Sequence, residues 1–519
     1  MTTSMTVMVR RAVVLLAPML LTMAACTNLD ENPESFITPG NFYSNEAEVV
    51  SGLAGVYAQL RHVVDDYWNI TEISTDELVV PTRGQDWYDN GQWLEVHGQT
   101  WAASSPSTLS LINGAWGMAY TGITRANALI EALDKLTTPV PNQAMIVAEA
   151  RTLRAFYYYV LMDGFGGVPL ATSTELKARE RVSRDSLFQF IDAELTAARP
   201  DLPDHPATYG RIGKAVVDAI QANMYLNAAV YTKDTGVSAT SYNSCTTVQI
   251  GGKTACQAAV DAADRIINSG LYQLADSFPK NFRANDDQSP ENIFVADFKS
   301  QDGLGLNFVM RALHYNQFTP SPWNGFATLA ATYNAFDAAD ERRQDVFLAG
   351  PQKNVLTGQP ATDRQGNPLV FTTTINDITS ATEGEGVRFY KWPADPAHVN
   401  ENNGNDYAFF RLGEIYLIKA EALNEITPGS AQALTLLNAL RARVFNPAKP
   451  VGAVDRNAIL SERLFELTFE GKRRQDLIRF GQYTAAWQFK PVTDGKVLLL
   501  PIPQTQLDAN PLLTQNPGY

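Results

Sequence analysis

Cysteine is scarce in this chain of 519 residues, which contains only Cys26, Cys245 and Cys256. A zinc site built from cysteine needs at least two thiolates with a short, regular spacing together with further ligands, and the sequence offers no such group. Cys245 and Cys256 lie eleven residues apart in a segment rich in Gly, Ser and Thr. Outside the cytoplasm they can form a disulfide or remain free thiols, and the sequence leaves both alternatives open.

Catalytic motifs are also missing. The chain has five histidines, and no two of them lie within four residues of each other, which excludes the helical zinc-protease motif. It has neither a Gly-x-Ser-x-Gly nor a Gly-x-Gly-x-x-Gly pattern. Gly252-Lys253-Thr254 resembles the end of a phosphate loop, but Thr247 stands where the upstream glycine is needed, so the segment is interpreted as a helix-opening turn. We therefore expect no enzyme activity, cofactor or metal, although the spacing of 55 acidic residues cannot exclude the two carboxylates of a glycoside hydrolase.

Positive charge is in deficit, and long apolar runs are absent beyond the amino terminus. With 41 basic residues against 55 acidic ones, the formal net charge is −14, so the chain lacks the basic footprint of a nucleic-acid-binding protein. After residue 26 no stretch approaches the roughly 20 apolar residues that a membrane-spanning helix needs. The hydrophobic content of 45% suffices to bury one large core or two ordinary ones.

The amino terminus has the pattern of a secretory leader. Arg10 and Arg11 precede an apolar run over residues 12–21, which is followed by Met23-Ala24-Ala25-Cys26. Small residues before a cysteine let a signal peptidase reach the backbone, after which lipid can be attached to the sulfur and the amino group of the cysteine. The pattern predicts a signal peptide over residues 1–25 and a lipid anchor on Cys26. The alternative is a plain signal peptide with a coincidental cysteine.

Helical periodicity dominates the mature chain, which predicts a mainly α fold. Apolar residues recur at spacings of three and four in nine segments: Ala47 to Leu60, Ala115 to Leu133, Ile146 to Met162, Leu187 to Ala197, Ala215 to Tyr231, Cys256 to Ile267, Phe409 to Leu423, Ala431 to Val444 and Ile459 to Phe480. Several segments are adjacent and joined by short turns such as Thr427-Pro428-Gly429. This arrangement favours helical hairpins of the tetratricopeptide kind, which stack into a curved shell.

Two long stretches, Thr75 to Ser107 and Asn281 to Asn402, lack this periodicity and are rich in Gly, Pro, Asn, Asp and aromatic residues. Irregular segments of this length are usually functional or disordered, and their aromatic content argues against disorder. We interpret them as ligand-binding loops. No domain boundary is evident, so residues 26–519 are predicted to form a single domain. Within it, amino-terminal helices and binding loops occupy about 26–300, the irregular insert about 281–402 and a carboxyl-terminal helical part about 403–519.

Sequence motifs spread over the chain carry a family resemblance. They include Leu29-Asp30-Glu31-Asn32-Pro33 after Cys26, residues 151–158 (RTLRAFYY), 165–170 (FGGVPL), 411–414 (RLGE), 419–424 (KAEALN), and the terminal Gln515-Asn516-Pro517-Gly518-Tyr519. On these residues the chain resembles the SusD/RagB family of outer-membrane nutrient-uptake lipoproteins along nearly its whole mature length. One departure is Arg474, where many members carry Trp.

The resemblance implies a helical-repeat shell with a loop-rich binding face, anchored by lipid in the outer membrane and facing the cell surface. It also implies a partner, a SusC-like TonB-dependent transporter over which the protein sits as a lid. The ligand in this family is usually an oligosaccharide, although some members bind peptides, and members are not known for catalysis. We therefore expect a glycan-binding lipoprotein. The alternatives are a peptide-binding member, a glycoside hydrolase and a purely structural surface protein.

Charged residues recur on the last long helical segment. Glu462, Glu466, Glu470 and Arg474 follow one another at intervals of four residues, with Arg473 beside them. On one helix such residues are neighbours and form ion pairs. We interpret them as a structural network.

A site for sugars combines aromatic platforms, which stack on the C–H faces of the rings, with polar groups that bind the hydroxyls. The irregular stretches contain this combination in Asp76, Arg83, Asp86, Trp87, Trp93, Trp101, Trp323 and Asn324. The resemblance implies that Trp101 is the stacking tryptophan and that Asp76 lies in the hydrogen-bonding loop. The alternative is that the tryptophans anchor the loops to the core, which is the commoner fate of this residue in a large protein.

Overall fold

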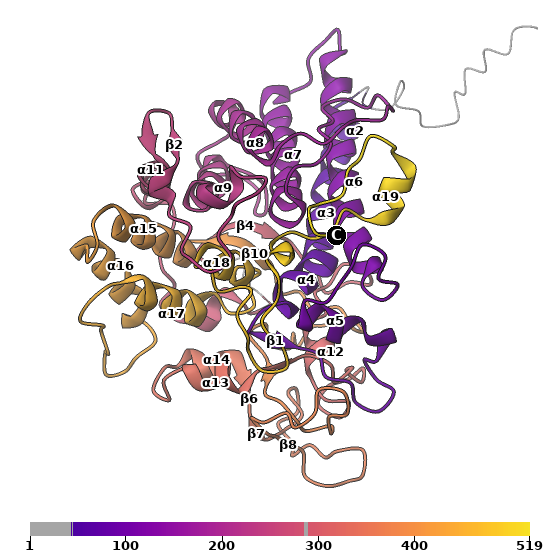
Figure 1. Cartoon of the computed structure of the whole chain (residues 1–519), viewed down its shortest axis with the longest axis vertical. Helices are drawn as coiled ribbons and strands as arrows, with labels where there is room; N and C mark the ends of the chain where they lie inside the picture. Colours follow the sequence, from indigo (N-terminus) through magenta and orange to yellow (C-terminus); the bar gives the residue numbers. More distant parts are fainter. Residues whose placement is uncertain (1–42, 44, 285–288) are drawn as a thin grey trace, which may run out of the picture.

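The computed structural model describes residues 43, 45–284 and 289–519, and most of its regular structure is helical (Figure 1). The helices of the first half are α2 (Glu46–Tyr57), α3 (Gln59–His62), α4 (Trp68–Ile73), α5 (Gln92–Gly98), α6 (Leu109–Asp134), α7 (Gln143–Phe165), α8 (Arg184–Ala198), α9 (Lys214–Leu226), α10 (Ala228–Tyr231) and α11 (Ala255–Ile267). Those of the carboxyl-terminal part are α15 (Leu412–Ile426), α16 (Ala431–Ala442), α17 (Arg456–Leu467), α18 (Arg473–Arg479) and α19 (Gln504–Ala509). The prediction of a mainly α fold is confirmed.

The helices pack against their neighbours in a continuous series. Helix α7 lies between α6 and α8, while α11 packs on both α9 and α15, and α15 in turn contacts α16 and α17. The sequence of α11 explains its central position, because five of its buried residues are alanines spaced three and four apart. Small side chains let neighbouring backbones approach closely. Thr254 starts this helix by accepting a hydrogen bond from the backbone N–H of Gln257, as its position before the apolar run predicts.

The irregular insert contains short helices and two-residue strands. Its helices are α12 (Phe308–Ala312), α13 (Ala330–Ala335) and α14 (Arg342–Val346). Antiparallel strand pairs join β6 (Phe347–Leu348) to β9 (Arg388–Phe389) and β7 (Gly350–Pro351) to β8 (Val370–Phe371). Outside the insert, β2 (Gln249–Ile250) pairs with β3 (Lys253–Thr254) in the turn that opens α11. Strands β6, β7 and β8 lie at the end of the molecule opposite α2 and α8 (Figure 1).

Two further strand pairs connect distant parts of the chain. Strand β4 (Asn292–Ala296) pairs with β10 (Tyr407–Arg411), which leads directly into α15. Strand β1 (Leu78–Val79) pairs with β5 (Ala327–Thr328) and so joins the two irregular stretches that the sequence predicts to bind ligand. Residues about 250 apart in sequence are therefore brought side by side.

Two of the predicted helical segments differ from the structure. Phe409 belongs to strand β10, all of whose residues are buried, so the strand shows no alternation of polar and apolar side chains that would distinguish it from a helix. The predicted helix from Ile459 to Phe480 is interrupted between α17 and α18, where Phe469 and Gly471 have φ values of 66° and 71°. A left-handed backbone conformation ends a right-handed helix. Glu470 and Arg474 are therefore not on the helix of Glu466, and the expected spacing of four residues does not create their contacts.

Glu466 and Glu470 nevertheless belong to a buried ion network, whereas the predicted members Arg473 and Arg474 pair elsewhere, with Asp76 and Asp163. Arg411, at the end of β10, donates to Glu466 at 2.7 Å, to Glu470 at 2.8 Å and to Glu291 at 3.1 Å. Arg342 of α14 reaches the other oxygen of Glu466 at 3.0 Å. The side chains of Arg411, Arg342 and the three glutamates are almost completely shielded from solvent. The network connects four separate chain segments.

Burial by itself would raise the pKa of Glu466, because it disfavours a charged carboxylate. The guanidinium groups of Arg443, Arg411 and Arg342 outweigh this effect and hold the pKa of Glu466 well below its usual range. The carboxylate thus remains charged in the core, and its charge is stabilised only while these arginines are in place.

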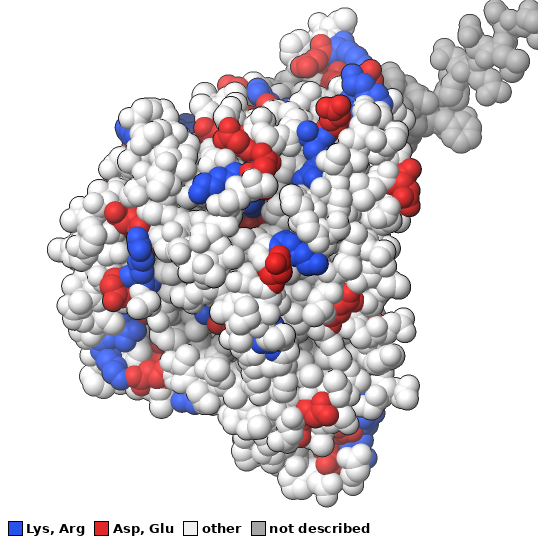
Figure 2. Space-filling model, in the orientation of Figure 1, with Lys and Arg blue, Asp and Glu red and all other residues white. Residues whose placement is uncertain are grey.

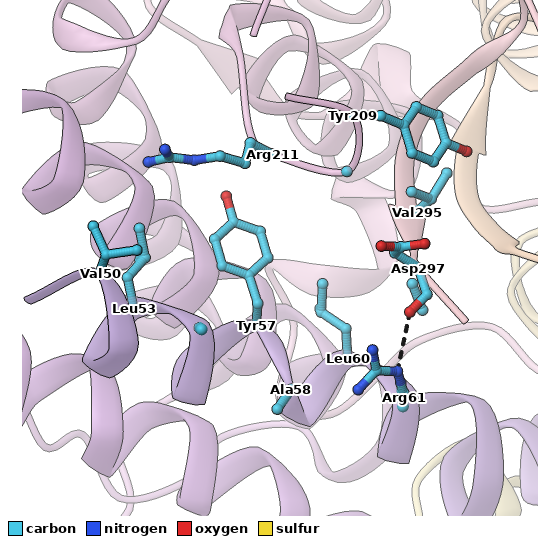
Figure 3. Close-up of a pocket in the computed structure, with 13 residues that line it drawn as sticks. Val50, Leu53, Tyr57, Ala58, Leu60, Arg61, Tyr209, Arg211, Val295 and Asp297 are labelled. Carbon is cyan, nitrogen blue, oxygen red and sulfur yellow. Dashed lines mark hydrogen bonds between the residues drawn. The ribbon is translucent and has the colours of Figure 1, made fainter. Parts of the chain in front are cut away.

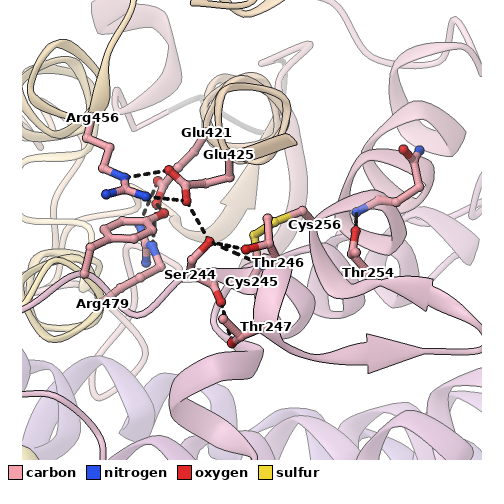
Figure 4. The surroundings of a disulfide bond; sticks show 12 residues. Ser244, Cys245, Thr246, Thr247, Thr254, Cys256, Glu421, Glu425, Arg456 and Arg479 are labelled. Carbon is pink, nitrogen blue, oxygen red and sulfur yellow. Dashed lines mark hydrogen bonds and ion pairs between the residues drawn. A yellow bond between two sulfur atoms is a disulfide. The ribbon is translucent and has the colours of Figure 1, made fainter. Parts of the chain in front are cut away.

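Cys245 and Cys256 form a disulfide between the 3-10 turn at Cys245–Thr247 and the first turn of α11 (Figure 4). Both residues are buried. Beside the bond, Ser244 donates a hydrogen bond to Glu425 of α15 at 2.7 Å, and Glu425 also pairs with Arg456 at 2.7 Å. The bond therefore lies where the segment before α11 meets α15 and α17.

The predicted leader over residues 1–25 and the predicted lipidation site at Cys26 lie outside the described residues. Within the described part of the chain, no helix combines the length and apolar character needed to cross a bilayer.

We predict that Arg411→Met lowers the free energy of unfolding by about 3–5 kcal/mol, because it leaves buried carboxylates without their partner. Urea denaturation followed by circular dichroism measures the change. The matched control is Lys449→Met, which removes a cation from the exposed pair with Asp337 and should cost at most about 1 kcal/mol. If both variants lowered the free energy of unfolding by the same amount, the buried network would contribute no more to stability than an exposed ion pair.

Candidate functional site

The pairing of β1 with β5 gathers six of the eight predicted site residues in one region: Arg83, Asp86, Trp87, Trp93, Trp323 and Asn324. Trp87 is at its centre. The indole N–H of Trp87 donates to the backbone carbonyl of Trp323 at 2.6 Å, and its ring centroid lies 5.5 Å from that of Trp93. The loop around residue 87 is thus fastened directly to the insert.

Arg83 and Asn324 form the base of this region and are not exposed to a ligand. The guanidinium of Arg83 is buried and donates to backbone carbonyls of Asn324 at 3.0 Å, Gly325 at 2.8 Å and Glu385 at 2.8 Å. Asn324 is completely buried, and its side chain binds Arg388 and the backbone of the insert. The structure therefore contradicts direct ligand contacts for both residues and gives them a supporting role.

Aromatic residues form the exposed part of the region. Trp87 and Trp323 are half-buried, whereas Tyr88 is 56% exposed. Trp93 is buried, packs on Trp87 and donates to Asp89 at 2.6 Å, so it supports the surface from below and offers no open face to a ligand.

The backbone of this loop is unusual. Trp87 has a φ of 61°, and Asp89 and Asn90 also have positive φ values. Side chains other than glycine rarely adopt such values, and clusters of them are found at functional sites. Gly325 fits under the loop, because a Cβ atom there would lie 2.2 Å from the ring of Trp87. The glycine thereby allows the indole to approach the backbone of the insert closely.

Polar side chains lie next to these rings. The hydroxyl of Tyr315 donates to the carboxylate of Asp86. The guanidinium of Arg364 stacks over the Tyr315 ring at 4.3 Å, and one of its nitrogens is 3.6 Å from Asp86. We call the exposed surface formed by Asp86, Trp87, Tyr88, Tyr315, Trp323 and Arg364 the Trp87 patch. It joins aromatic faces to charged groups of both signs.

Glu383 holds Arg364 in place from the other side. Its carboxylate pairs with the Arg364 side chain and accepts from His314 Nε2 at 2.9 Å. Partial burial would raise the pKa of Glu383, but the hydrogen bonds from His314 and Arg364 outweigh it and lower the pKa to about 2. Burial and the bond to Asp86 raise the pKa of Tyr315 to about 12. At neutral pH the phenol is therefore a donor and the glutamate an acceptor.

A hollow of about 540 Å³ adjoins the patch. Its lining includes Arg83, Arg364, Leu369, Thr382 and Glu383. This volume is within the range of small-molecule sites. Tyr315, Arg364 and Glu383 are not among the predicted site residues. Each is a single polar or aromatic residue in a long insert, and only its position in that insert could have indicated it.

The expectation that Trp101 stacks on a ligand is wrong for this structure. Trp101 is 2% exposed and belongs to the main hydrophobic core. Its indole N–H donates to the hydroxyl of Tyr519 at 2.8 Å, and that hydroxyl donates to the carbonyl of Leu499 at 2.8 Å. A buried ring has no free face for a sugar, so Trp101 anchors the loop to the carboxyl terminus.

Asp76 also lies apart from the Trp87 patch. Both of its oxygens accept from the buried guanidinium of Arg473, at 2.7 and 2.6 Å. Such two-point pairs fix geometry as well as charge. Asp76 therefore fastens the start of the first loop to α18 and is not placed to bind a ligand at the patch.

A second pocket, of about 340 Å³, lies between helices α2 and α3 on one side and the turn at Tyr209 together with β4 on the other (Figure 3). Its walls are largely apolar, and they include Val50 and Leu53. Tyr57 and Arg211 face each other there, but both bind the buried Glu149. Few polar groups remain for sugar hydroxyls, so the Trp87 patch is the better candidate.

The surface has no strongly charged area of one sign on the face in view. Lysine and arginine side chains lie beside aspartate and glutamate, with wide uncharged areas between them (Figure 2). Among the residues that the structure describes, no three His, Cys, Asp or Glu side chains come together as a metal site.

Two family profiles match the chain. The sequence profile described as "SusD family" matches residues 270–519, and the profile "Starch-binding associating with outer membrane" matches residues 29–226. The chain belongs to the SusD/RagB family.

The chain is also similar in sequence to named relatives, over most of its own length and of theirs. The SusD-like protein P2 of Formosa agariphila is 25% identical, over 96% of this chain and 98% of the relative. The starch-binding protein SusD of Bacteroides thetaiotaomicron is 24% identical, over 87% of this chain and 85% of its own. Among solved structures, the surface glycan-binding protein A of the same organism in complex with laminarihexaose aligns with a TM-score of 0.70 and 21% identity. The alignment covers 91% of this chain and 100% of that one, and it shows that the SusD fold is shared.

We predict that Trp101→Ala lowers the free energy of unfolding by about 3–5 kcal/mol, because it removes a buried ring from the core of this SusD fold. Trp101→Phe keeps most of the ring and loses mainly the hydrogen bond to Tyr519, so it should cost much less. Thermal unfolding of both variants provides the comparison. A Trp101→Ala protein as stable as the parent would restore the ligand-stacking hypothesis.

Proposed function

We propose that the chain is a cell-surface, glycan-binding lipoprotein that captures oligosaccharides and delivers them to a SusC-like TonB-dependent transporter. The Trp87 patch is the observation that carries this proposal. Sugar rings stack their C–H faces on indole and phenol rings, and their hydroxyls bind carboxylates and guanidinium groups. The patch presents Tyr88 and Trp87 beside Asp86 and Arg364, which supplies both kinds of contact. The starch-binding and laminarihexaose-bound relatives support the same ligand class.

The carboxylates of the patch favour binding over hydrolysis. A glycosidase needs one carboxylic acid that keeps its proton near neutral pH and a second carboxylate on the other side of the scissile bond. Glu383 has the opposite property, with a pKa lowered to about 2. Asp86 is bound by the Tyr315 hydroxyl and lies close to Arg364. Both groups are arranged as hydrogen-bond acceptors, so we propose capture without turnover.

Delivery of a captured ligand across the outer membrane requires a transporter as partner. The leader and Ala24-Ala25-Cys26 support an anchor in the outer membrane, and the family profile is described as associating with that membrane. A protein held there by lipid has no pore of its own. We propose that residues 26–519 act as one unit that hands its ligand to a TonB-dependent barrel.

We predict that the protein binds neutral oligosaccharides with dissociation constants in the micromolar to millimolar range, about −8 to −4 kcal/mol. Tyr88→Ala should weaken binding by about 30-fold, since truncating an aromatic anchor costs on the order of 2 kcal/mol. Calorimetric titration with laminarihexaose, maltohexaose and a peptide panel measures this effect. The control is Tyr209→Ala, which removes another exposed tyrosine, one that lines the pocket between α2 and β4 and not the Trp87 patch. Release of reducing sugar, or binding of peptides alone, would contradict the proposal.

We further predict that Cys26→Ala moves the protein from the membrane fraction to the soluble fraction, because the variant lacks the acceptor for lipid. Fractionation followed by immunoblotting detects the change. Extraction of the parent protein in mild detergent should co-purify a large β-barrel. Retention of the variant in the membrane would reject the anchor, and repeated absence of a barrel would reject the transporter partner.

A further inference from the structure

A third hollow, of about 650 Å³, lies in the irregular insert between α13, α14 and the strands β6 and β7. It shares no residue with the Trp87 patch. Its aromatic walls are Tyr333, Phe347 and Tyr390, and its polar side chains are Arg343, Gln344, Gln352, Lys353 and Asn354. We call it the Arg343 cleft. Its volume is suited to a ligand of a few sugar rings.

The cations of the Arg343 cleft are not engaged by carboxylates. Within the described part of the chain, the Arg343 side chain makes neither a hydrogen bond nor an ion pair, and its Nε is buried without a partner. Its guanidinium lies 4.3 Å from the centroid of the Tyr333 ring. The ammonium of Lys353 likewise has no ion pair or hydrogen bond among the described residues. Two positive charges are therefore available to a ligand.

The neighbouring acids explain why these charges remain available. No aspartate or glutamate lines the cleft. The adjacent Arg342 has Asp340, Glu462 and Glu466 as partners, so these three acids are engaged away from Arg343. Glu341 and Asp345, which flank Arg343 in sequence, are not among the lining residues. In a chain with a net charge of −14, a cleft lined by two cations and no acid stands out electrostatically.

The walls of the cleft provide the remaining contacts for a saccharide. Tyr333 and Tyr390 are half-buried, so each keeps part of its ring exposed. The Tyr390 oxygen accepts from the backbone N–H of Ala394 at 3.0 Å, and burial raises the pKa of Tyr390. The phenol therefore keeps its proton, which can be donated to a ligand. The cleft therefore combines rings for stacking, a phenol donor and two cations without a carboxylate partner, whereas the one cation of the Trp87 patch, Arg364, is already paired with Glu383.

We propose that the Arg343 cleft is a second binding site, specific for an anionic saccharide whose carboxylate or sulfate group pairs with Arg343 and Lys353. A guanidinium matches the planar, two-oxygen edge of such groups better than an ammonium does. The stacking of Arg343 on Tyr333 holds the fork in position before the ligand arrives, which reduces the entropy lost on binding. The proposal rests on the glycan-binding function and extends it to charged glycans at a separate place on the molecule.

The test uses the full-length protein in mild detergent and three probes: trigalacturonate, a sulfated galactan tetrasaccharide and neutral laminarihexaose. Arg343→Met should weaken binding of at least one anionic probe by at least tenfold, in keeping with the strength of charge-assisted hydrogen bonds. Arg343→Lys should give an intermediate affinity, and Lys353→Met a smaller loss. Laminarihexaose affinity should not change. The control is Lys135→Met, which makes the same change of charge beyond the end of α6.

Further measurements separate this site from the Trp87 patch. Raising the salt from about 50 to 500 mM should weaken anionic binding and leave neutral binding unchanged, because salt screens exposed charges. Saturating laminarihexaose should not displace the anionic probe, and Tyr88→Ala should leave anionic binding intact. Tyr390→Phe removes one hydrogen-bond donor without altering the charge of the cleft. If the Arg343 variants fold poorly, a weaker affinity of the Tyr390→Phe protein for the anionic probes would still support the assignment.

Each outcome decides the matter. The Arg343 cleft is overturned as a site if neither anionic probe binds. It is also overturned if the Arg343→Met protein binds both probes as tightly as the parent protein does. Loss of anionic binding on Tyr88→Ala, or competition by laminarihexaose, would place all binding at the Trp87 patch and also overturn it. Anionic binding that depends on Arg343, in a protein that fails to bind neutral glycans, would support the cleft while rejecting the neutral ligand proposed for the Trp87 patch.

Discussion

The buried ion network around Arg411 is the constraint on which the rest of the structure depends. Removing several charges from water costs more than any single ion pair returns, so the arrangement is stable only when every member has its partners. Glu466 and Glu470 flank the break between α17 and α18 and are held by Arg411 at the end of β10. The segment after Glu466 then contacts the first irregular stretch, since Glu77 accepts a hydrogen bond from the backbone N–H of Phe469 at 2.9 Å. The Trp87 patch is thus attached to the helical shell through this network.

The sequence predicted the role of these charges better than their geometry. Spacing of four residues suggested pairs along one helix, but the left-handed residues Phe469 and Gly471 end α17 and turn the chain. Glu470 consequently meets Arg411, which comes from a strand about sixty residues earlier in the chain. Helix positions were predictable because an apolar stripe must face a neighbour. The strand β10 was not, because burial on both faces removes the alternation by which strands are recognised.

Composition indicated which loop residues lie in one region, but not which of them are exposed, because burial depends on the whole fold. Six of the eight predicted residues meet because β1 pairs with β5, a contact between two-residue strands that no local pattern reveals. Trp101 and Trp87 look alike in sequence, yet one lies in the core against the last residue of the chain and the other lies at the surface. The difference depends on where Tyr519 packs, which is set by the whole fold. Tyr315 and Arg364 were missed for the same reason, since their partner Asp86 is more than 200 residues away.

The Trp87 patch holds its polar groups in place through bonds to one another, which has a consequence for affinity. Asp86, Tyr315, Arg364 and Glu383 already form hydrogen bonds or ion pairs among themselves. A ligand hydroxyl therefore meets groups of fixed orientation, which lowers the entropy lost on binding. The same hydroxyl must also share partners that are already satisfied, so each new hydrogen bond yields little net free energy. Polar groups of fixed orientation that gain little free energy from each new hydrogen bond would bind a ligand selectively but weakly. That combination suits the proposed role in ligand delivery, because tight binding would slow release to the proposed transporter.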